Sequence, residues 1–541
     1  MSIQNHARFS LEAPLAGQKV NLDALVPRED FESDTGSSGG SDRDRISLSD
    51  LEASAFFAGT LRKPDFQRET THWGPDAVVD LIKAFLEGHL IPAVILWQSG
   101  DHVFVIDGAH RLSALISWIR DDYGDGTASI SKYGSGLTEE QRKIADRVRK
   151  KVRKDIGPYA EFKGLIGQEV SDAKKARWLR RMGSGAVEVQ WVTAADSKAA
   201  EASFFKINQA AQPIDPTERR ILQTRKAPDA ISARCIARGA KGHKYWAGFA
   251  PEVQREIEQL GEELFKVLYE PPHNAPITTS DVPIAGKGYN ALPFVFELVN
   301  VSNGIPLPTS ASAKKIPDAL PEDVDGQKTV EFLKRVQSKL RLVSTNHSGS
   351  LGLHPLVYCY SATGNFQPNA FLATVEFAAK IDERGKKNDF TKIRNRFEAY
   401  LARNRTYVSL TMSRLGAGGR SLSRVVDLYW SIAEAMWGEK DDDDIIGWLS
   451  QQKDFAHLKQ LEVPPPGAEL PPSKSSPSSS AKSAAFIRLV MESPRRCAIC
   501  DAAVHSNSVT FDHITRAREG GDSRTGNLQP THPFCNSGYK S

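Results

Sequence analysis

The stretch CAICDAAVHSNSVTFDHITRAREGGDSRTGNLQPTHPFCN, residues 497–536, decides how the end of this chain folds. It contains two pairs of metal-ligand residues, Cys497 with Cys500 and His532 with Cys535, and two residues separate the members of each pair. Three thiolates and one imidazole suit tetrahedral Zn²⁺ in a closed structural site. Because so short a segment cannot build a sufficient core alone, the sequence predicts a small module stapled by structural zinc.

Polar residues lie between and beside these pairs in a recognisable order. A β-prone run ends in Asp512, His513 and Ile514, a Gly-Gly pair follows, then Asn527, and Asn536 stands directly after the last cysteine. This order resembles the Cys-containing HNH endonuclease family with its ββα-metal fold, over about residues 496–540. Many members of this family have a third cysteine at the position of His532 and a histidine at the position of Asn536.

The resemblance implies a role for each of these residues. His513 would be the general base that activates water against a phosphodiester, and Asp512 and Asn536 would hold a catalytic Mg²⁺ or Mn²⁺ ion. Asn527 would orient the base through the loop backbone. The chemistry agrees, because hydrolysis needs a water deprotonated near neutral pH and a cation over the developing charge. The alternative is a zinc ribbon that only binds DNA, with Asp512 and His513 a structural pair; the ordered additional residues favour the nuclease.

A second informative stretch lies near the front of the chain. Residues 93–97 and 102–106 are β-branched and aromatic runs joined by a short turn, which predicts a hairpin. Asp107-Gly108 then leads into a predicted helix over residues 109–119, and apolar spacing predicts an earlier helix from Pro75 to the stop at Gly88.

Several short elements accompany this stretch: Phe66-Gln67-Arg68 with Trp73 and Ile91-Pro92, then Asp107-Gly108-Ala-His110-Arg111, and later Phe204-Phe-Lys-Ile-Asn208 with Glu218. Together they resemble the N-terminal domain of GmrSD-type restriction enzymes, a ParB-related α/β fold, over about residues 61–222. The resemblance implies antiphage defence, in which modified DNA is sensed and a nuclease domain is licensed, with a nucleoside triphosphate as ligand and an accessory NTPase activity. The implied nucleotide-binding residues are Gln67, Arg68, Asp107, Gly108, His110, Arg111 and Asn208.

The turn at Asp107-Gly108 has two interpretations. Backbone amides at the start of a helix attract an anion, and an arginine such as Arg111 can make bidentate phosphate contacts, while His110 could position water. Many family members have glutamine where His110 stands. The alternative is that Asp107-Gly108 is only a turn and that His110 and Arg111 make hydrogen bonds that hold the fold.

Composition sets the remaining limits. The chain has 541 residues, 40% hydrophobic and 25% charged, which predicts two or three domains of an α+β protein. A formal charge of +4 permits nucleic-acid binding without demanding it. No apolar run reaches about 20 residues, and the start lacks a leader pattern, so we expect a cytoplasmic protein without a membrane partner. The isolated Cys235 and Cys359 are expected to be buried small hydrophobes.

The expected domain order follows from composition shifts. A polar flexible arm (1–50) precedes the ParB-like sensor domain (51–222), a largely helical domain (223–461), a Pro/Ser linker (462–484) and the HNH domain (485–541). Four amphipathic patterns predict helices in the helical domain, at residues 253–268, 329–342, 390–401 and 422–436.

Together these patterns predict a metal-dependent DNA endonuclease that a nucleotide-binding sensor domain gates and that restricts foreign or modified phage DNA. The rival hypothesis is a non-catalytic, nucleotide-dependent DNA-binding regulator with a zinc-ribbon tail. The sequence also leaves open cleavage of RNA, nicking of one strand and assembly into a homo-oligomer.

Overall fold

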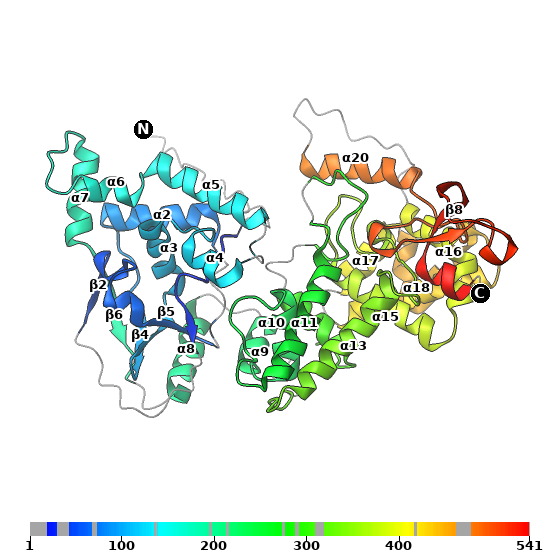
Figure 1. Ribbon diagram of the computed structural model, residues 1–541, viewed down its shortest axis with the longest axis horizontal. Helices are drawn as coiled ribbons and strands as arrows, with labels where there is room; N and C mark the ends of the chain where they lie inside the picture. The colour runs from blue at the N-terminus through cyan, green and yellow to red at the C-terminus, as the bar shows by residue number, and fades with distance from the viewer. Residues whose placement is uncertain are drawn as a thin grey trace, which may run out of the picture. The chain divides into compact units, whose positions relative to one another are not determined.

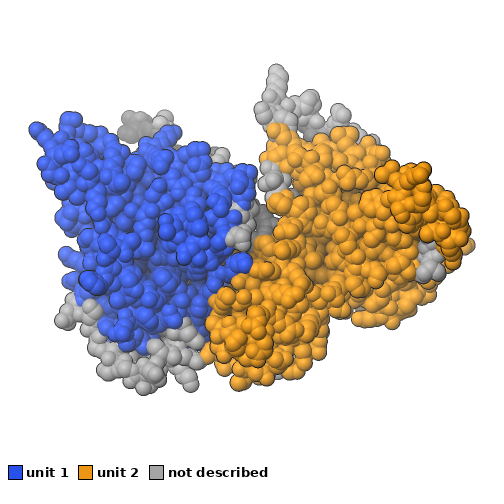
Figure 2. Space-filling model, viewed as in Figure 1, with its two compact units in different colours: residues 1–225, 241–243 blue, residues 226–240, 244–541 orange. Residues whose placement is uncertain are grey.

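The computed structural model describes residues 19–29, 43–65, 67, 73–134, 137, 139–193, 197–211, 216–272, 276–286, 292–308, 319–415, 419–460 and 478–539. The α+β chain divides into two compact units, coloured separately in Figure 2. Unit 1 comprises residues 1–225 and 241–243, and unit 2 comprises residues 226–240 and 244–541. Within the described residues, no helix combines the length and apolarity needed to cross a membrane.

A mixed six-stranded sheet organises unit 1, with the strand order β1-β3-β5-β4-β6-β2. The parallel pairs are β1 with β3, β3 with β5 and β4 with β6, whereas β4 with β5 and β2 with β6 are antiparallel. The strands are β1 (Arg28–Glu29), β2 (Arg45–Ser47), β3 (Leu61–Pro64), β4 (Val94–Ser99), β5 (His102–Asp107) and β6 (Ala186–Trp191).

The elements predicted around the Asp107-Gly108 turn are confirmed. Strands β4 and β5 form the hairpin, and α3 (Ala109–Arg120) begins directly after it. The earlier helix is α2 (Pro75–Glu87), which Gly88 ends with a left-handed φ of 77°. The other helices of unit 1 are η1 (Ser49–Leu51), α1 (Phe56–Thr60), α4 (Thr127–Tyr133), α5 (Glu139–Asp155), α6 (Tyr159–Gly164), α7 (Ala173–Ser184), α8 (Ser197–Ala211) and α9 (Pro216–Gln223).

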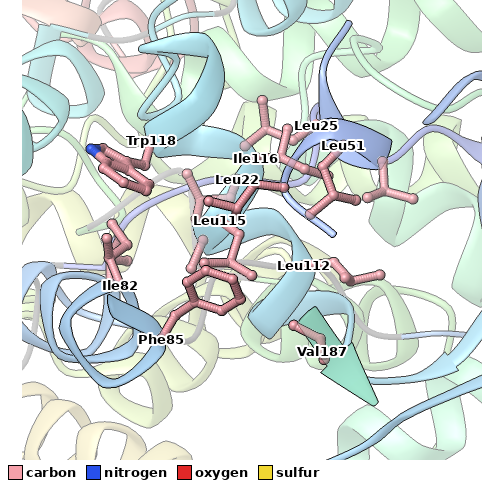
Figure 3. Packing of buried hydrophobic residues seen from close by; sticks show 14 of the residues in the cluster. Leu22, Leu25, Leu51, Ile82, Phe85, Leu112, Leu115, Ile116, Trp118 and Val187 are labelled. Atoms are coloured by element: carbon pink, nitrogen blue, oxygen red, sulfur yellow. The ribbon is translucent and has the colours of Figure 1, made fainter. Parts of the chain in front are cut away.

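Helices cover both faces of this sheet (Figure 1). On one face Leu112, Leu115 and Ile116 of α3 pack with Ile82 and Phe85 of α2, as Figure 3 shows. On the other face, a smaller cluster joins α8 and α9 to β4 and β5; its buried residues are Trp97, Phe104, Ile106, Ala200, Phe204 and Leu222. The turn between β5 and α3 is therefore held on a rigid, two-sided scaffold.

The expected flexible arm requires a correction. Within residues 1–50, the segments 19–29 and 43–50 are ordered parts of unit 1 and supply the edge strands β1 and β2. Leu22, Leu25 and Ile46 are buried in the main core. The sequence of these segments is mostly polar, so their few apolar residues do not predict a strand. These side chains become buried only when the segments pair with the sheet of unit 1.

Unit 2 is mainly helical, and its four predicted amphipathic helices are confirmed as α11, α13, α16 and α18. Its core includes stacked rings of Phe377 and Phe397, 5.7 Å apart between centroids, and both isolated cysteines are buried. The helices are α10 (Pro228–Ala237), α11 (Pro251–Tyr269), α12 (Leu292–Ser302), α13 (Gln327–Val343), α14 (Pro355–Tyr358), α15 (Pro368–Glu383), α16 (Lys387–Arg403), α17 (Thr406–Leu415), α18 (Gly419–Trp437), α19 (Asp442–Gln451), η3 (Lys453–Gln460) and α20 (Ser479–Glu492).

The chain ends in a small ββα module. Strands β7 (Thr510–His513) and β8 (Leu528–Thr531) pair antiparallel, and the short helical turn η7 (Cys535–Tyr539) follows them. Single turns connect these parts: η4 (Ser506–Ser508), η5 (Ala517–Glu519) and η6 (Thr525–Asn527).

This module packs against the helices of unit 2. The Phe534 amide donates to the Ser350 carbonyl over 3.1 Å, and Ser508 Oγ donates to the Thr345 carbonyl over 2.8 Å. Most of the expected Pro/Ser linker, residues 461–477, lies outside the described residues. Residues 478–484, expected in the same linker, are instead the start of α20, where Ser483 Oγ accepts from the Ile277 amide over 3.0 Å.

Candidate active site and metal centre

The four predicted zinc ligands converge, although they come from two segments separated by the hairpin. One ligand atom from each of Cys497, Cys500, His532 and Cys535 lies within 4.8 Å of every other. His532 Nδ1 is 3.4 Å from Cys500 Sγ and 3.9 Å from Cys535 Sγ. This donor set fits a closed tetrahedral zinc site.

His532 is prepared for the ligand role. Its Nε2 lies 3.1 Å from the Ala503 carbonyl, so Nε2 carries the proton and Nδ1 keeps the lone pair that faces the sulfurs. Burial lowers the pKa of this imidazole, which favours the neutral form that binds a metal. A polar contact of this kind, outside the ligands themselves, is typical of metal-binding histidines.

Asp512 and His513 end strand β7 and face opposite sides of the hairpin, because successive strand residues alternate. Asp512 is paired with Gln529 on β8, whose Nε2 donates to Asp512 Oδ2 over 3.2 Å. That bond orients the carboxylate. Asp512 as a whole residue is only 9% exposed. Ser523 Oγ lies 3.5 Å from His513 Nε2, and both groups remain near solvent.

Asn527 clamps the loop that follows His513. Its Oδ1 accepts from the Thr515 amide over 2.7 Å, and its Nδ2 donates to the carbonyls of Thr515 and Asp522 over 3.0 and 2.6 Å. Gly521 permits this closure, because a Cβ there would lie 1.8 Å from the Thr515 carbonyl oxygen. The Gly-Gly signal in the sequence therefore has a steric cause.

Asn536 lies on η7 beside strand β7. Its Nδ2 is 3.4 Å from both Thr510 Oγ1 and the Phe511 carbonyl, so its amide oxygen is the atom suited to a cation. The structure thus places Asn536 beside strand β7, which carries Asp512, and places Asn527 against the loop after His513.

Of the residues predicted for the nucleotide pocket, Gln67 follows β3, while Asp107, Gly108 and Arg111 lie where β5 leads into α3. Arg111 Nη2 donates to Asp107 Oδ2 over 2.7 Å and to the Ala93 carbonyl over 3.1 Å, and Gly108 has a φ of 97°. Gln67 Nε2 donates to the Ile106 carbonyl over 3.2 Å, which links the two strand ends.

The remaining predicted pocket residues are placed in part. The ring of His110 lies 5.6 Å from the ring of Trp73, between centroids. Arg68 lies outside the described residues, and Asn208 is placed in α8 without a described side chain. The hydrogen bonds of Arg111 are those expected if it holds the fold.

Comparison with protein families places two known domains on this chain. Residues 50–222 match the GmrSD restriction endonuclease N-terminal domain, and residues 497–541 match the HNH endonuclease. The chain joins a GmrSD-type domain to an HNH nuclease domain. HNH nucleases use divalent metals and act on DNA, so the chain is a nuclease with DNA as its partner. No curated protein and no solved structure matches it.

Unit 1 also contains a buried charge cluster, which the sequence pattern did not predict and which joins residues before and within the matched range. The carboxylate of Asp23 contacts Arg28, Lys63 and Lys132, with Arg28 Nη2 at 3.1 Å and Lys132 Nζ at 3.2 Å. The same Arg28 donates to the Gln67 carbonyl. Lys63 is fully buried, and burial lowers its pKa to about 7. The only sequence signal is a lysine inside a strand, because the partners are distant in sequence.

Proposed function

We propose that this chain is a metal-dependent DNA endonuclease whose HNH domain cuts when the GmrSD-type domain has bound a nucleoside triphosphate, and that it restricts foreign or modified phage DNA. The observation that carries the nuclease half is the arrangement of Asp512, His513, Asn527 and Asn536 around one strand and its following loop. The gating half rests on the GmrSD-type domain and its pocket residues.

In this proposal His513 accepts the proton of the attacking water, whose oxygen forms the new P–O bond while the old one breaks. Asp512 and Asn536 hold a divalent ion, Mg²⁺ or Mn²⁺, which when bound stabilises the negative charge on the phosphate. Gln529 keeps the Asp512 carboxylate in position. Asn527 holds the loop that directly follows His513, which matters because small misplacements of a catalytic group are costly.

The test of the nuclease half is cutting of plasmid DNA with Mg²⁺ or Mn²⁺ by the wild type and by His513→Ala. We expect the variant to lose cutting while it keeps zinc and DNA binding. His89→Ala, which removes an exposed histidine of the GmrSD-type domain, is the matched control and should cut normally. Cutting that persists in His513→Ala would contradict the assignment of the base. A wild type that binds DNA and zinc but never cuts would favour the regulator.

The gating half is supported by two polar atoms of the pocket. Arg111 Nε and Gln67 Oε1 are buried and have no hydrogen-bond partner among the described residues. Buried polar atoms are normally satisfied, so a ligand oxygen or hydroxyl that reached them would be favourable. An accessory NTPase step with His110 positioning water is part of this proposal.

The gating test measures binding of ATP and GTP, and cutting of unmodified and modified phage DNA with and without them. Arg111→Ala should lose nucleotide binding and nucleotide-dependent cutting, whereas Arg153→Ala, at an exposed position of α5, should keep both. Thermal unfolding shows whether Arg111→Ala still folds. A folded Arg111→Ala protein that binds nucleotide as tightly as the wild type would remove this loop from the pocket.

A further inference from the structure

The zinc ligands of the HNH domain are covered by a loop from the helical part of unit 2. We call residues 344–354, between α13 and α14, the cradle loop. A Cβ placed on Gly352 of this loop would lie 2.6 Å from His532 Cδ2 and 2.8 Å from Ser508 Oγ. Only a glycine therefore allows the loop to approach the ligand so closely.

Hydrogen bonds hold the cradle loop to the HNH domain along its length. Ser508 Oγ donates to the Thr345 carbonyl, and Asn346 Oδ1 accepts from the Val509 amide over 3.1 Å. Ser537 Oγ donates to the Ser348 carbonyl over 2.8 Å. The contacts reach both sides of the metal centre, the segment before β7 and the turn after β8.

Arg394 of α16 supports the cradle loop from the helical side and is only 1% exposed. Its Nη2 donates to the Gly352 carbonyl over 2.7 Å, and its Nη1 donates to the Leu351 carbonyl. Its Nε donates to Glu398 Oε1 over 2.7 Å, which fixes the plane of the guanidinium. The arginine thus positions Gly352, which contacts His532, and its neighbour Leu351.

The charge of Arg394 also suits this position. Three thiolates with Zn²⁺ and a neutral imidazole carry a net negative charge, and buried charge is costly unless an opposite charge is near. Burial alone would lower the pKa of Arg394, but Glu398, Cys500 and Cys535 act on it electrostatically and raise it. The guanidinium is therefore a buried positive charge on the loop whose Gly352 contacts the zinc ligand His532.

We infer that the helical part of unit 2 completes the zinc site. The cradle loop contacts the zinc ligand His532, and Arg394 holds that loop in place, so both support the ligands without binding the metal themselves. Zinc retention and docking of the HNH domain on α16 are then one linked equilibrium. The inference rests on the zinc assignment and is independent of whether the domain cuts.

The test measures Zn²⁺ affinity of the full chain by competition with a chelator, and Co²⁺ absorbance as a report on the ligand set. Arg394→Met should weaken zinc binding about 10- to 100-fold, the usual effect of removing an outer partner of a metal ligand. Arg394→Lys, which keeps the charge, should weaken it less. Arg403→Met changes an exposed arginine of the same helix and should bind zinc as the wild type does. Affinity of folded Arg394→Met within twofold of the wild type would overturn the inference.

A glycine pair separates the metal effect from general destabilisation. Gly352 and Gly304 have similar φ values of 66° and 72°, but a Cβ on Gly304 would meet nothing within 4 Å. Gly352→Ala should lower zinc affinity, and Gly304→Ala should not. Thermal unfolding with and without zinc gives the second readout. The zinc-induced rise in Tm should shrink in Arg394→Met and Gly352→Ala, and an undiminished rise in both variants would show that these residues only stabilise the helices.

Discussion

The pKa of Lys63 offers a quantitative test of the buried charge cluster in unit 1. It is fully buried beside Asp23, with Arg28 and Lys132 on the same carboxylate. Burial, opposed by Asp23 and reinforced by Arg28 and Lys132, lowers the pKa of Lys63 from 10.5 to about 7. Folding therefore penalises the protonated lysine.

The sign and size of the pH effect follow from this pKa. Between pH 7 and 10.5 the unfolded chain binds more protons at Lys63 than the folded chain, so stability rises with pH in this window. The full penalty, about 5 kcal/mol at ~1.4 kcal/mol per pH unit, is present below pH 7. About 3 kcal/mol of it should be relieved between roughly pH 6 and 9. Burial also lowers the pKa of Lys132, which adds a contribution of the same sign.

Lys63→Met removes the buried cation and leaves Asp23 with two partners. Removing one member of a buried ion pair is destabilising when it leaves the other charge without a partner, but Asp23 keeps Arg28 and Lys132, and the substitution also removes the penalty for the protonated lysine. We expect the variant to be at least as stable as the wild type near pH 6 and to lose most of the pH dependence. Hydrogen exchange of β3 and β5 in the intact chain, corrected for intrinsic exchange rates, measures both quantities.

Lys175→Met is the control, because Lys175 pairs with Glu161 at the surface and should leave the slope unchanged. A wild type whose opening free energy is flat between about pH 6 and 9 would refute the reasoning, since the linkage requires a slope. The same conclusion would follow if Lys63→Met kept the slope of the wild type.

Three further predictions concern the HNH domain. Asn527→Ala should lower the single-turnover cutting rate on the order of 100-fold with little change in DNA affinity, because the loop after His513 loses its clamp; an unchanged rate would exclude a positioning role. Gly521→Ala should lower the cutting rate by a comparable factor, since the added Cβ would overlap the Thr515 carbonyl. Gly526→Ala is the control, because a Cβ there meets nothing within 4 Å, and this variant should cut at the rate of the wild type. Equal cutting rates of the two glycine variants would contradict the steric argument. Chelation of zinc should abolish hydrogen-exchange protection of β7 and β8, because the module has too little core to fold without metal; protection that survives verified zinc loss would disprove a structural role.

Much of the candidate site could be predicted because its signals are local. The two-residue spacing of Cys497 with Cys500 places both thiols on one turn, and the β-prone run at residues 509–514 predicts a strand. The same holds for the hairpin and helix around Asp107, and for the four amphipathic helices of unit 2. In each case the side chain pattern and the backbone conformation belong to the same short segment.

Other features needed the tertiary structure. Residues 19–29 and 43–50 look like a polar arm until the edges of a sheet bury their few apolar side chains. Lys63 looks like an ordinary strand lysine until Asp23 and Lys132 are placed beside it. Such contacts depend on how distant segments pack, which periodicity and turn chemistry do not encode.

The sequence by itself determined the chemistry of this protein: four ligands for zinc, an Asp-His pair on a strand and a turn that enters a helix. Only the tertiary structure decided what surrounds that chemistry. The spacing of Cys497, Cys500, His532 and Cys535 predicts a metal site but says nothing of Arg394, which holds the loop that contacts His532. The reason is physical, because a ligand pair is a local geometry, whereas the charge and packing around it come from whichever segments the fold brings near.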